Sequence, residues 1–495
     1  MKNFFSKHKN ILLLSIVAFI LLRLPSFWEP NWHPDEGFYA TVATSMANGK
    51  ILYRDTFDHK APLIYFTYML GSGLGKLFYI KLLNLIFGLV GLIGFSRLVK
   101  VFSKSTAVYL ASIISFTLLF GSSFREGNIA NTENFFVPIV IWALVLALEY
   151  PTKIKYFISG ILFAFAFQYK FHSLLDLFAL CLFWLVLDPK NVVQLIKDKL
   201  VWILGGFGLV NFLVVIFLLL KGLFFDYFNA VYLFSFSYST DNRGFVLNRL
   251  DVKLLVYLLL LIWAYWKYKK KQNISEKTFL LLILASSALF AMSLGGRNYP
   301  HYYLQLVPYA SIIIGFLYVK YLQHNKLLLT GAVITIFSGL LLLHLVGGYK
   351  NAACQRQGIL SPNESVFRYY YVFGKYLTGD TYTHSEYFNC IEMHIEDLQE
   401  QVADLDPEQI YIYDFIGWHY LAIGYEPPVV FLNPYHTFLS DYIAEDVIKE
   451  LKANNVDMIA IRVGIDPEDG LEDLIQEDYE LVSSSRYYNF YRINE

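Results

Sequence analysis

The sequence HPDEGFYATVATSMANGKILYRDTFDHKAPL, residues 33–63, says most about the fold and function of this chain. It lies between two apolar runs, in a polar segment that we bound at residues 26–62. Connections between helices in compact proteins are usually short, so a simple connector needs few polar residues. This segment predicts a folded loop with a functional role, although a wet, charged loop with ordinary capping is the alternative. Its ionisable side chains are His33, Asp35, Glu36, Asp55, Asp58, His59 and Lys60.

A helical pattern begins at Pro34 and runs through Met46. Asp35 and Glu36 then lie in the first turn, where the helix dipole favours ionised carboxylates. Asp35 and Tyr39 are four residues apart and therefore share one face of the helix. The pattern therefore predicts a helix that begins with two carboxylates.

The whole chain is far more apolar than a soluble domain. Of its 495 residues, 56% are hydrophobic and 16% are charged, whereas soluble proteins carry about 25% charged residues. This composition excludes a disordered chain, a collagen-like fibre and an ordinary cytosolic enzyme. The net charge of −1 and the lack of a basic stripe disfavour a nucleic-acid partner. We expect a polytopic α-helical protein of the lipid bilayer.

A transmembrane helix needs about 20 mostly apolar residues. Reading the hydropathy in windows predicts about eleven such helices. The apolar runs lie near residues 11–24, 77–99, 106–122, 134–149, 154–170, 173–188, 200–220, 250–267, 278–294, 302–321 and 327–346.

The distribution of charge predicts how these helices are oriented. Lys and Arg recur in every second loop, which places those loops and the N-terminus in the cytoplasm. An odd number of helices then places the acidic tail outside. We therefore expect a transmembrane domain at residues 1–347 and an extracytoplasmic domain at residues 348–495, in a multi-pass protein of the plasma membrane.

The tail has the pattern of a small α/β domain. Strand-like runs lie at Gln409–Tyr413, Val429–Leu432 and Asp457–Val463. An amphipathic helical pattern spans Asp441–Ala453, with Ser440 as its expected N-cap. This alternation predicts a βαβ layer.

Two further polar clusters lie in the expected outer loops. Glu133 stands at the membrane edge, where ionisable groups are costly and are usually paired or functional. Arg125 or Lys170 would pair with it if its role is structural. The segment Gly295–Pro308 holds Arg297 and His301, followed by Tyr302. Arginine binds phosphate in a bidentate manner, and histidine adds a donor that can carry charge.

All three clusters face the same side of the membrane in this topology. Their carboxylates and cations suit the transfer of a group from a lipid phosphate. One carboxylate would remove a proton from the acceptor, and the cations would stabilise the phosphate that leaves.

The chain resembles the polytopic glycosyltransferases of the GT-C fold, in particular the protein mannosyltransferase and aminoarabinose transferase-like superfamily, glycosyltransferase family 39. The residues that carry the resemblance are HPDEGFYA at 33–40, YRDTFDHKAPL at 53–63, TENFF at 132–136 and RNYPHYYLQLVP at 297–308. The resemblance implies a polyprenyl-phosphate sugar as donor and inversion at the anomeric carbon. The acceptor stays open among protein, lipid and cell-wall glycan.

The resemblance also implies roles for individual residues. Asp35 would be the catalytic general base, with Glu36 in support. Lys60, Arg297 and His301 would bind the donor phosphate. Further candidates for substrate binding are Tyr39, Asp58, His59, Arg125, Glu133, Lys170 and Tyr302.

One departure concerns metal binding. Some members of the family have an acidic residue just before the lysine, where this chain has His59, and Ala61 stands where proline is common. We therefore predict no obligatory metal or other cofactor, and we leave a divalent metal open.

Two other classes of function stay open. A polytopic transporter or flippase also carries charges within the membrane, but it commonly shows internal repeats that this sequence lacks. A glycan polymerase or ligase would use a polyprenyl-diphosphate donor.

Overall fold

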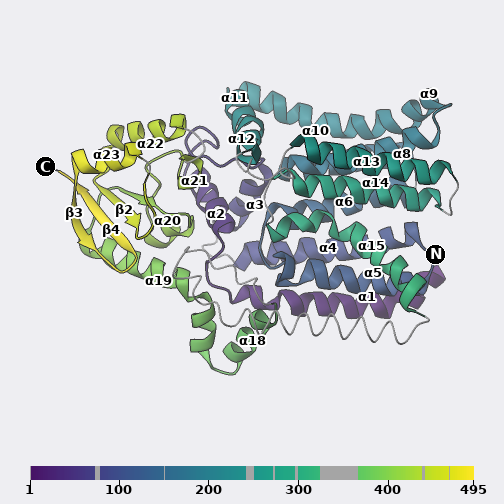
Figure 1. The fold of residues 1–495 in the computed structure, drawn as a ribbon, viewed down its shortest axis with the longest axis horizontal. Helices are drawn as coiled ribbons and strands as arrows, with labels where there is room; N and C mark the ends of the chain where they lie inside the picture. The colour runs from purple at the N-terminus through teal and green to yellow at the C-terminus, as the bar shows by residue number, and fades with distance from the viewer. Residues whose placement is uncertain are drawn as a thin grey trace.

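The computed structural model describes residues 2–72, 78–149, 151–240, 250–270, 274–295, 299–323, 366–437, 441–467 and 469–494. Helices in the N-terminal part lie side by side in a bundle, and the C-terminal part forms a mixed helix and sheet layer at one end of it (Figure 1). The long α1 and α4 run along the bundle, and α2 lies between the bundle and the C-terminal part.

The N-terminal part is entirely helical where it is described. Its longer helices are α1 (Lys2–Arg23), α2 (Pro34–Ala47), α3 (Leu63–Ser72), α4 (Phe78–Phe102), α5 (Thr106–Gly121), α6 (Thr132–Glu149), α7 (Lys153–Tyr169), α8 (Leu174–Leu187), α10 (Val201–Leu220), α13 (Leu250–Lys269), α14 (Glu276–Ser293) and α15 (Val307–Leu317). Its short elements are η1 (Leu24–Phe27), η2 (Ser123–Arg125), η3 (Phe171–Ser173), α9 (Val192–Leu195), η4 (Ile196–Leu200), α11 (Phe224–Phe228), η5 (Asn229–Phe234), α12 (Ser235–Thr240), η7 (Pro300–Gln305) and η8 (Tyr318–Leu322).

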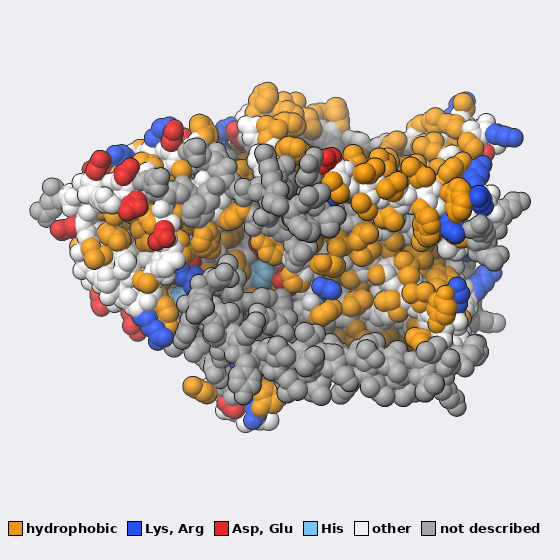
Figure 2. Space-filling model, viewed as in Figure 1, with side chains coloured by type: hydrophobic (Ala, Val, Ile, Leu, Met, Phe, Trp, Pro, Cys, Tyr) orange, Lys and Arg blue, Asp and Glu red, His pale blue; other side chains and the backbone are white. Residues whose placement is uncertain are grey.

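Several helices have the length and composition of membrane spans. In the described ranges, 5 segments are long and apolar enough, namely His8–Phe27, Phe78–Phe102, Thr132–Glu149, Val192–Leu220 and Glu276–Ser293. Shorter apolar helices span Thr106–Gly121, Phe171–Leu187 and Val307–Leu322. Hydrophobic side chains cover much of the bundle surface in Figure 2, as expected for a surface that contacts lipid. These helices agree with predicted apolar runs, while the run at 327–346 lies outside the described residues.

Helices α7 and α10 touch backbone to backbone at two glycines. A Cβ atom on Gly160 would lie 1.9 Å from the carbonyl oxygen of Ile203, and one on Gly206 would lie 2.0 Å from that of Phe157. Small residues allow such close approach, which stabilises helix pairs in a membrane where the hydrophobic effect between helices is absent. The contact fixes α7, whose C-terminal end precedes Lys170.

The C-terminal part contains a four-stranded sheet of order β1-β2-β4-β3. Strands β1 and β2 pair in parallel, and β4 is antiparallel to both β2 and β3. The elements are α18 (Val366–Leu377), α19 (Thr381–Leu405), β1 (Ile410–Tyr413), α20 (Trp418–Ile423), α21 (Pro434–Thr437), α22 (Asp441–Ala453), β2 (Met458–Arg462), α23 (Asp469–Asp478), β3 (Tyr479–Ser484) and β4 (Tyr488–Ile493).

The sequence predicted three of these elements. The predicted strands at 409–413 and 457–463 correspond to β1 and β2, and the predicted helix corresponds to α22. The strand predicted at Val429–Leu432 is wrong, because this run forms bends and loop. Its apolar side chains pack in the core without joining the sheet ladder, as buried Val429 and Leu432 show. The expected N-cap Ser440 lies outside the described residues.

The C-terminal part docks on α2. The indole nitrogen of Trp418 donates to the carbonyl of His33 at 2.9 Å, and the hydroxyl of Thr41 donates to the carbonyl of Gly417 at 2.6 Å. A Cβ atom on Gly37 would lie 2.8 Å from the backbone nitrogen of Trp418. The start of α2, which carries Asp35, is therefore held between the bundle and the C-terminal part.

We predict that Gly206→Ala destabilises the chain because the added methyl group meets the backbone of α7. Overpacking of this kind costs about 1–3 kcal/mol, and the melting temperature in detergent should fall by several degrees. Gly208→Ala is the control, since a Cβ at Gly208 of the same helix has no described heavy atom within 4 Å. Equal melting temperatures for the two variants would contradict the packing.

Candidate active site

A cavity of about 270 Å³ lies where the loop at residues 26–62, the turn before α15 and the C-terminal part meet. We call it the Asp35 cavity. Pro34 occupies the first position of α2 and His33 caps it in extended conformation, so Asp35 lies in the first turn. The cavity is lined by Trp32, His33, Pro34, Asp35, Phe38, Tyr39, Asp58, His59, Lys60, Glu126, Tyr299, Pro300, His301, Tyr302, Phe415, Asn433, Tyr435 and His436.

A second cavity of about 290 Å³ adjoins the first, and we call it the Lys170 cavity. It shares His59, Lys60 and Tyr302 with the Asp35 cavity. Its other lining is mostly aromatic and aliphatic, and it includes Phe236 and Leu250, both of which are exposed on the bundle surface. The full lining adds Ala61, Tyr169, Lys170, Phe171, His172, Tyr232, Ser235, Leu294 and Gly295.

Lys60 lies in a buried polar group where the two cavities meet. Its Nζ atom is 2.5 Å from Nε2 of His59, and Nδ1 of His59 is 3.0 Å from the carboxylate of Asp58. Burial opposes ionisation of Asp58, but the hydrogen bond from His59 and the charge of Lys60 hold the pKa of Asp58 well below its usual range. Burial and the charge of Lys60 lower the pKa of His59.

His436 reaches this group from α21 in the C-terminal part. Its Nε2 atom lies 4.0 Å from the carboxylate of Asp58. The centres of the His436 and His59 rings are 5.6 Å apart, and the rings meet edge-on. Burial lowers the pKa of His436 to about 3. Ligand atoms of Asp58, His59 and His436 all lie within 4.8 Å of one another, a set that matches a three-ligand divalent metal site.

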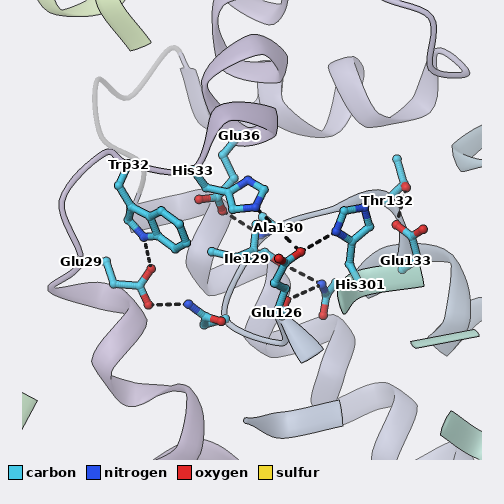
Figure 3. A network of polar contacts seen from close by, with 12 residues as sticks. Glu29, Trp32, His33, Glu36, Glu126, Ile129, Ala130, Thr132, Glu133 and His301 are labelled. Carbon is cyan, nitrogen blue, oxygen red and sulfur yellow. Dashed lines mark hydrogen bonds and ion pairs between the residues drawn. The ribbon is translucent and has the colours of Figure 1, made fainter. Parts of the chain in front are cut away.

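Glu126 forms a second polar group on the wall of the Asp35 cavity (Figure 3). Its carboxylate contacts Nδ1 of His301 directly and lies 3.8 Å from Nε2 of His33. Burial opposes ionisation of Glu126, but the charge and hydrogen bond of His301 hold its pKa well below the usual range. Burial alone would lower the pKa of His33, yet the hydrogen bond and charge of Glu126 raise it.

Glu36 makes structural contacts instead of facing the cavities. Its carboxylate is 2.9 Å from Nζ of Lys81 on α4 and accepts a hydrogen bond of 2.7 Å from the backbone of Ala130. Glu36 is not one of the described residues that line either cavity. The adjacent residues Asp35 and Glu36 therefore point to different surroundings, as neighbours on a helix do.

Glu133 pairs with Lys170, one of the two partners that the sequence left open. The distance between their charged atoms is 2.5 Å, and the ammonium lies 4.1 Å from the ring centre of Tyr302. Arg125 stacks instead on Tyr303, 4.3 Å from the ring centre. Neither Glu133 nor Arg125 is among the described lining residues.

The structure thus brings together most residues that the sequence singled out. Asp35, Tyr39, Lys60, His301 and Tyr302 line the Asp35 cavity. They are joined there by Asp58 and His59, while Lys170 lines the second cavity. Arg297 lies outside the described residues.

The sequence analysis missed the residues that the C-terminal part contributes. The Asp35 cavity is also lined by residues that lie far from Asp35 in the sequence, namely Phe415, Asn433, Tyr435 and His436. No local motif marks them, because their position depends on how the C-terminal part docks. Glu126 follows the candidate residue Arg125 in the sequence, but its contact with two histidines depends on the fold.

Comparisons with known proteins support the resemblance seen in the sequence. Residues 59–218 match the family model described as dolichyl-phosphate-mannose-protein mannosyltransferase. The structure of ArnT from Cupriavidus metallidurans bound to undecaprenyl phosphate matches with a TM-score of 0.62 and 14% identity over 98% of both chains. An Archaeoglobus fulgidus oligosaccharyltransferase tethered with an acceptor peptide gives a TM-score of 0.48 and 13% identity, over 100% of this chain and 75% of that one.

No curated protein sequence matches the chain. At 14% identity the likeness to ArnT shows the fold, and the family model adds the sequence signature of a glycosyltransferase. The resemblance to GT-C glycosyltransferases is confirmed.

We predict that Glu36→Gln mainly lowers stability. The substitution leaves Lys81 buried with only Glu29, 3.7 Å away, as a charged partner among the contacts described for it. Breaking a buried pair costs about 3–5 kcal/mol, so the melting temperature in detergent should fall markedly.

Glu445→Gln is the control, because Glu445 and Lys449 form an exposed pair that contributes about 1 kcal/mol or less. A Glu36→Gln protein that melts like the native chain but loses turnover would show that Glu36 takes part in the chemistry.

Proposed function

We propose that this membrane glycosyltransferase of the GT-C fold moves a sugar from a polyprenyl-phosphate donor to an acceptor hydroxyl, with inversion, on the extracytoplasmic face. The observation that carries the proposal is the meeting of two cavities at Lys60 and Tyr302. One cavity is largely apolar and reaches the bundle surface, and the other contains Asp35. A lipid phosphate and a polar acceptor therefore each have a place beside the same lysine.

The Lys170 cavity suits the donor. Exposed Phe236 and Leu250 let a lipid chain enter from the membrane, while the head group meets Lys60. Lys60 is half-buried, and a partly desolvated ammonium stabilises a phosphate more than an exposed one because less water screens the charge. ArnT was crystallised with undecaprenyl phosphate, a ligand of this class. Lys170 adds a second positive charge, partly balanced by Glu133.

The Asp35 cavity suits the acceptor. Asp35 is half-buried in the first turn of α2 and lines this cavity. In the proposed step, the acceptor oxygen attacks the anomeric carbon while Asp35 takes the hydroxyl proton. The bond between that carbon and the phosphate oxygen breaks, and the phosphate leaves with the electron pair beside Lys60. A single displacement of this kind inverts the anomeric carbon.

We propose a cytoplasmic N-terminus and an extracytoplasmic C-terminal domain. Basic side chains gather at the end of the bundle opposite the C-terminal part in Figure 2. Positive charge marks cytoplasmic loops, so this distribution supports a site on the outer face. The transmembrane domain would comprise residues 1–347 and the outer domain residues 348–495.

We also propose that a divalent cation can bind to Asp58, His59 and His436 without being required for transfer. Nδ1 of buried His436 has no hydrogen-bond partner among the described residues, which leaves it available as a ligand. A cation bound there would link the first outer loop to the C-terminal part. Lys60, 2.5 Å from His59, supplies the positive charge that the leaving phosphate needs in its absence.

Asp35→Asn should abolish transfer from a radiolabelled polyprenyl-monophosphate sugar while the protein stays folded. Loss of a general base lowers the rate by about 10²–10⁴-fold. Asp55→Asn is the matched control, because Asp55 lies in the same loop and bonds only to the backbone of Ile51 among its described contacts.

Unimpaired transfer by Asp35→Asn would contradict its role as base. Transfer from a diphosphate donor alone would favour a polymerase or ligase, and lipid movement without transfer would favour a flippase.

Chelation with EDTA should leave the transfer rate unchanged but lower the melting temperature, because the cation joins two parts of the chain. His436→Ala should remove the effect of EDTA on melting. Metal content measured by mass spectrometry provides the independent readout. Turnover that disappears on chelation and returns with added metal would contradict an optional role.

A further inference from the structure

Glu126 has an unusual backbone conformation for a glutamate. Its φ of 56° and ψ of 33° lie in the left-handed region, which residues other than glycine adopt rarely. The turn holds it there, since its N–H donates to Ser123 at 3.0 Å and its carbonyl accepts from Ile129 at 3.1 Å and from Asn134 at 3.2 Å. Strain that the surroundings enforce is often found at functional sites.

This conformation places the Glu126 carboxylate between two histidines from distant segments (Figure 3). His33 precedes α2 and His301 belongs to η7. Both rings and the carboxylate are buried and line the Asp35 cavity. Tyr302, which follows His301, lies where the two cavities meet. The two histidines therefore lie next to the proposed reaction centre, but they are separate from the polar group formed by Asp58, His59, Lys60 and His436.

The contact also orients His301. Glu126 binds Nδ1 of the ring, so Nε2 is left to face another group. A carboxylate that holds one imidazole nitrogen fixes the tautomer and the direction of the other, as in catalytic triads. The ring of His301 stacks on Tyr299 at 5.7 Å and meets Tyr302 edge-on at 4.7 Å, which further restricts its rotation.

We propose that Glu126 is a positioning residue that fixes the rings of His33 and His301, so that His301 donates a hydrogen bond from Nε2 to the donor phosphate. This inference rests on the proposed function and adds Glu126 and His33 to the site. The hydrogen bond stabilises the negative charge that the phosphate gains as the sugar leaves, and Glu126, which raises the pKa of His33, favours a positive charge beside it.

Other charged groups also act on the two histidines. Asp35 and Glu36 act on His33 in addition to Glu126, and both raise its pKa. Glu133 of α6 interacts electrostatically with His301. Among the described cations, Lys60 lines the same cavity and Lys170 pairs with Glu133.

The test is the pH dependence of transfer in Glu126→Gln. If protonated His33 supports transfer, activity is lost as pH rises through the pKa of His33. Glu126 raises that pKa, so removing its negative charge should move the alkaline limb of the pH–rate profile to lower pH by about one unit or more. Above the wild-type midpoint, kcat/KM should then fall by about tenfold, while the two proteins converge at low pH. Glu126→Asp should restore part of the shift.

Glu29→Gln is the matched control. Glu29 is a buried carboxylate of the same network, but its described hydrogen bonds go to Trp32, Asn128 and Tyr369 and to neither histidine (Figure 3). This variant is expected to melt earlier without moving the alkaline limb. An unmoved limb in Glu126→Gln, with activity reduced equally at every pH, would overturn the proposal and leave a structural role only.

A second measurement separates this inference from the proposed function. NMR titration of ¹³C-labelled histidine rings in the purified chain, with His33→Gln used for assignment, needs no substrate. Glu126→Gln should lower the pKa of His33, and an unchanged value would overturn the inference. If the pKa falls as expected but the wild-type chain transfers no sugar, the proposed function fails while the charge-holding role of Glu126 stands.

Discussion

The site depends on a contact between two backbones. Gly37 in α2 and Gly417 before α20 lie so close that a Cβ on Gly417 would meet the nitrogen of Phe38 at 2.4 Å. Only glycine permits this approach, and it brings the C-terminal part into contact with the segment at residues 26–62. Without that contact the Asp35 cavity would lose the wall formed by Phe415, Asn433, Tyr435 and His436.

Burial then decides the role of each carboxylate. A buried charge must be paired, so Glu36 with Lys81 and Glu133 with Lys170 mainly hold segments together. Asp35 is half-buried and faces a cavity, which leaves it available to a ligand. Neighbouring carboxylates of one sequence cluster therefore differ in their surroundings, since Glu36 is paired and buried while Asp35 faces a cavity.

The sequence predicted the helical body, the loop that carries the site, strands β1 and β2 and helix α22, because these depend on local periodicity and charge. It also singled out Asp35, Lys60 and His301, which the fold brings to one cavity. It could not predict that Glu126 joins two histidines, since the left-handed turn has no clear sequence signal. His436 was missed for a similar reason, as its place beside Asp58 results from long-range docking. The false strand at Val429–Leu432 shows that an apolar run indicates burial more reliably than pairing.

The central claim is that one cavity receives the lipid phosphate and the other the acceptor, with Lys60 between them. Binding of undecaprenyl phosphate to the purified chain in detergent tests it most directly, with Lys60→Gln and Asp35→Asn compared in parallel. The account predicts that the native chain and Asp35→Asn bind equally well, whereas Lys60→Gln binds at least tenfold more weakly, about 1.4 kcal/mol. Equal binding by Lys60→Gln, or no binding by the native chain, would contradict the division of the site.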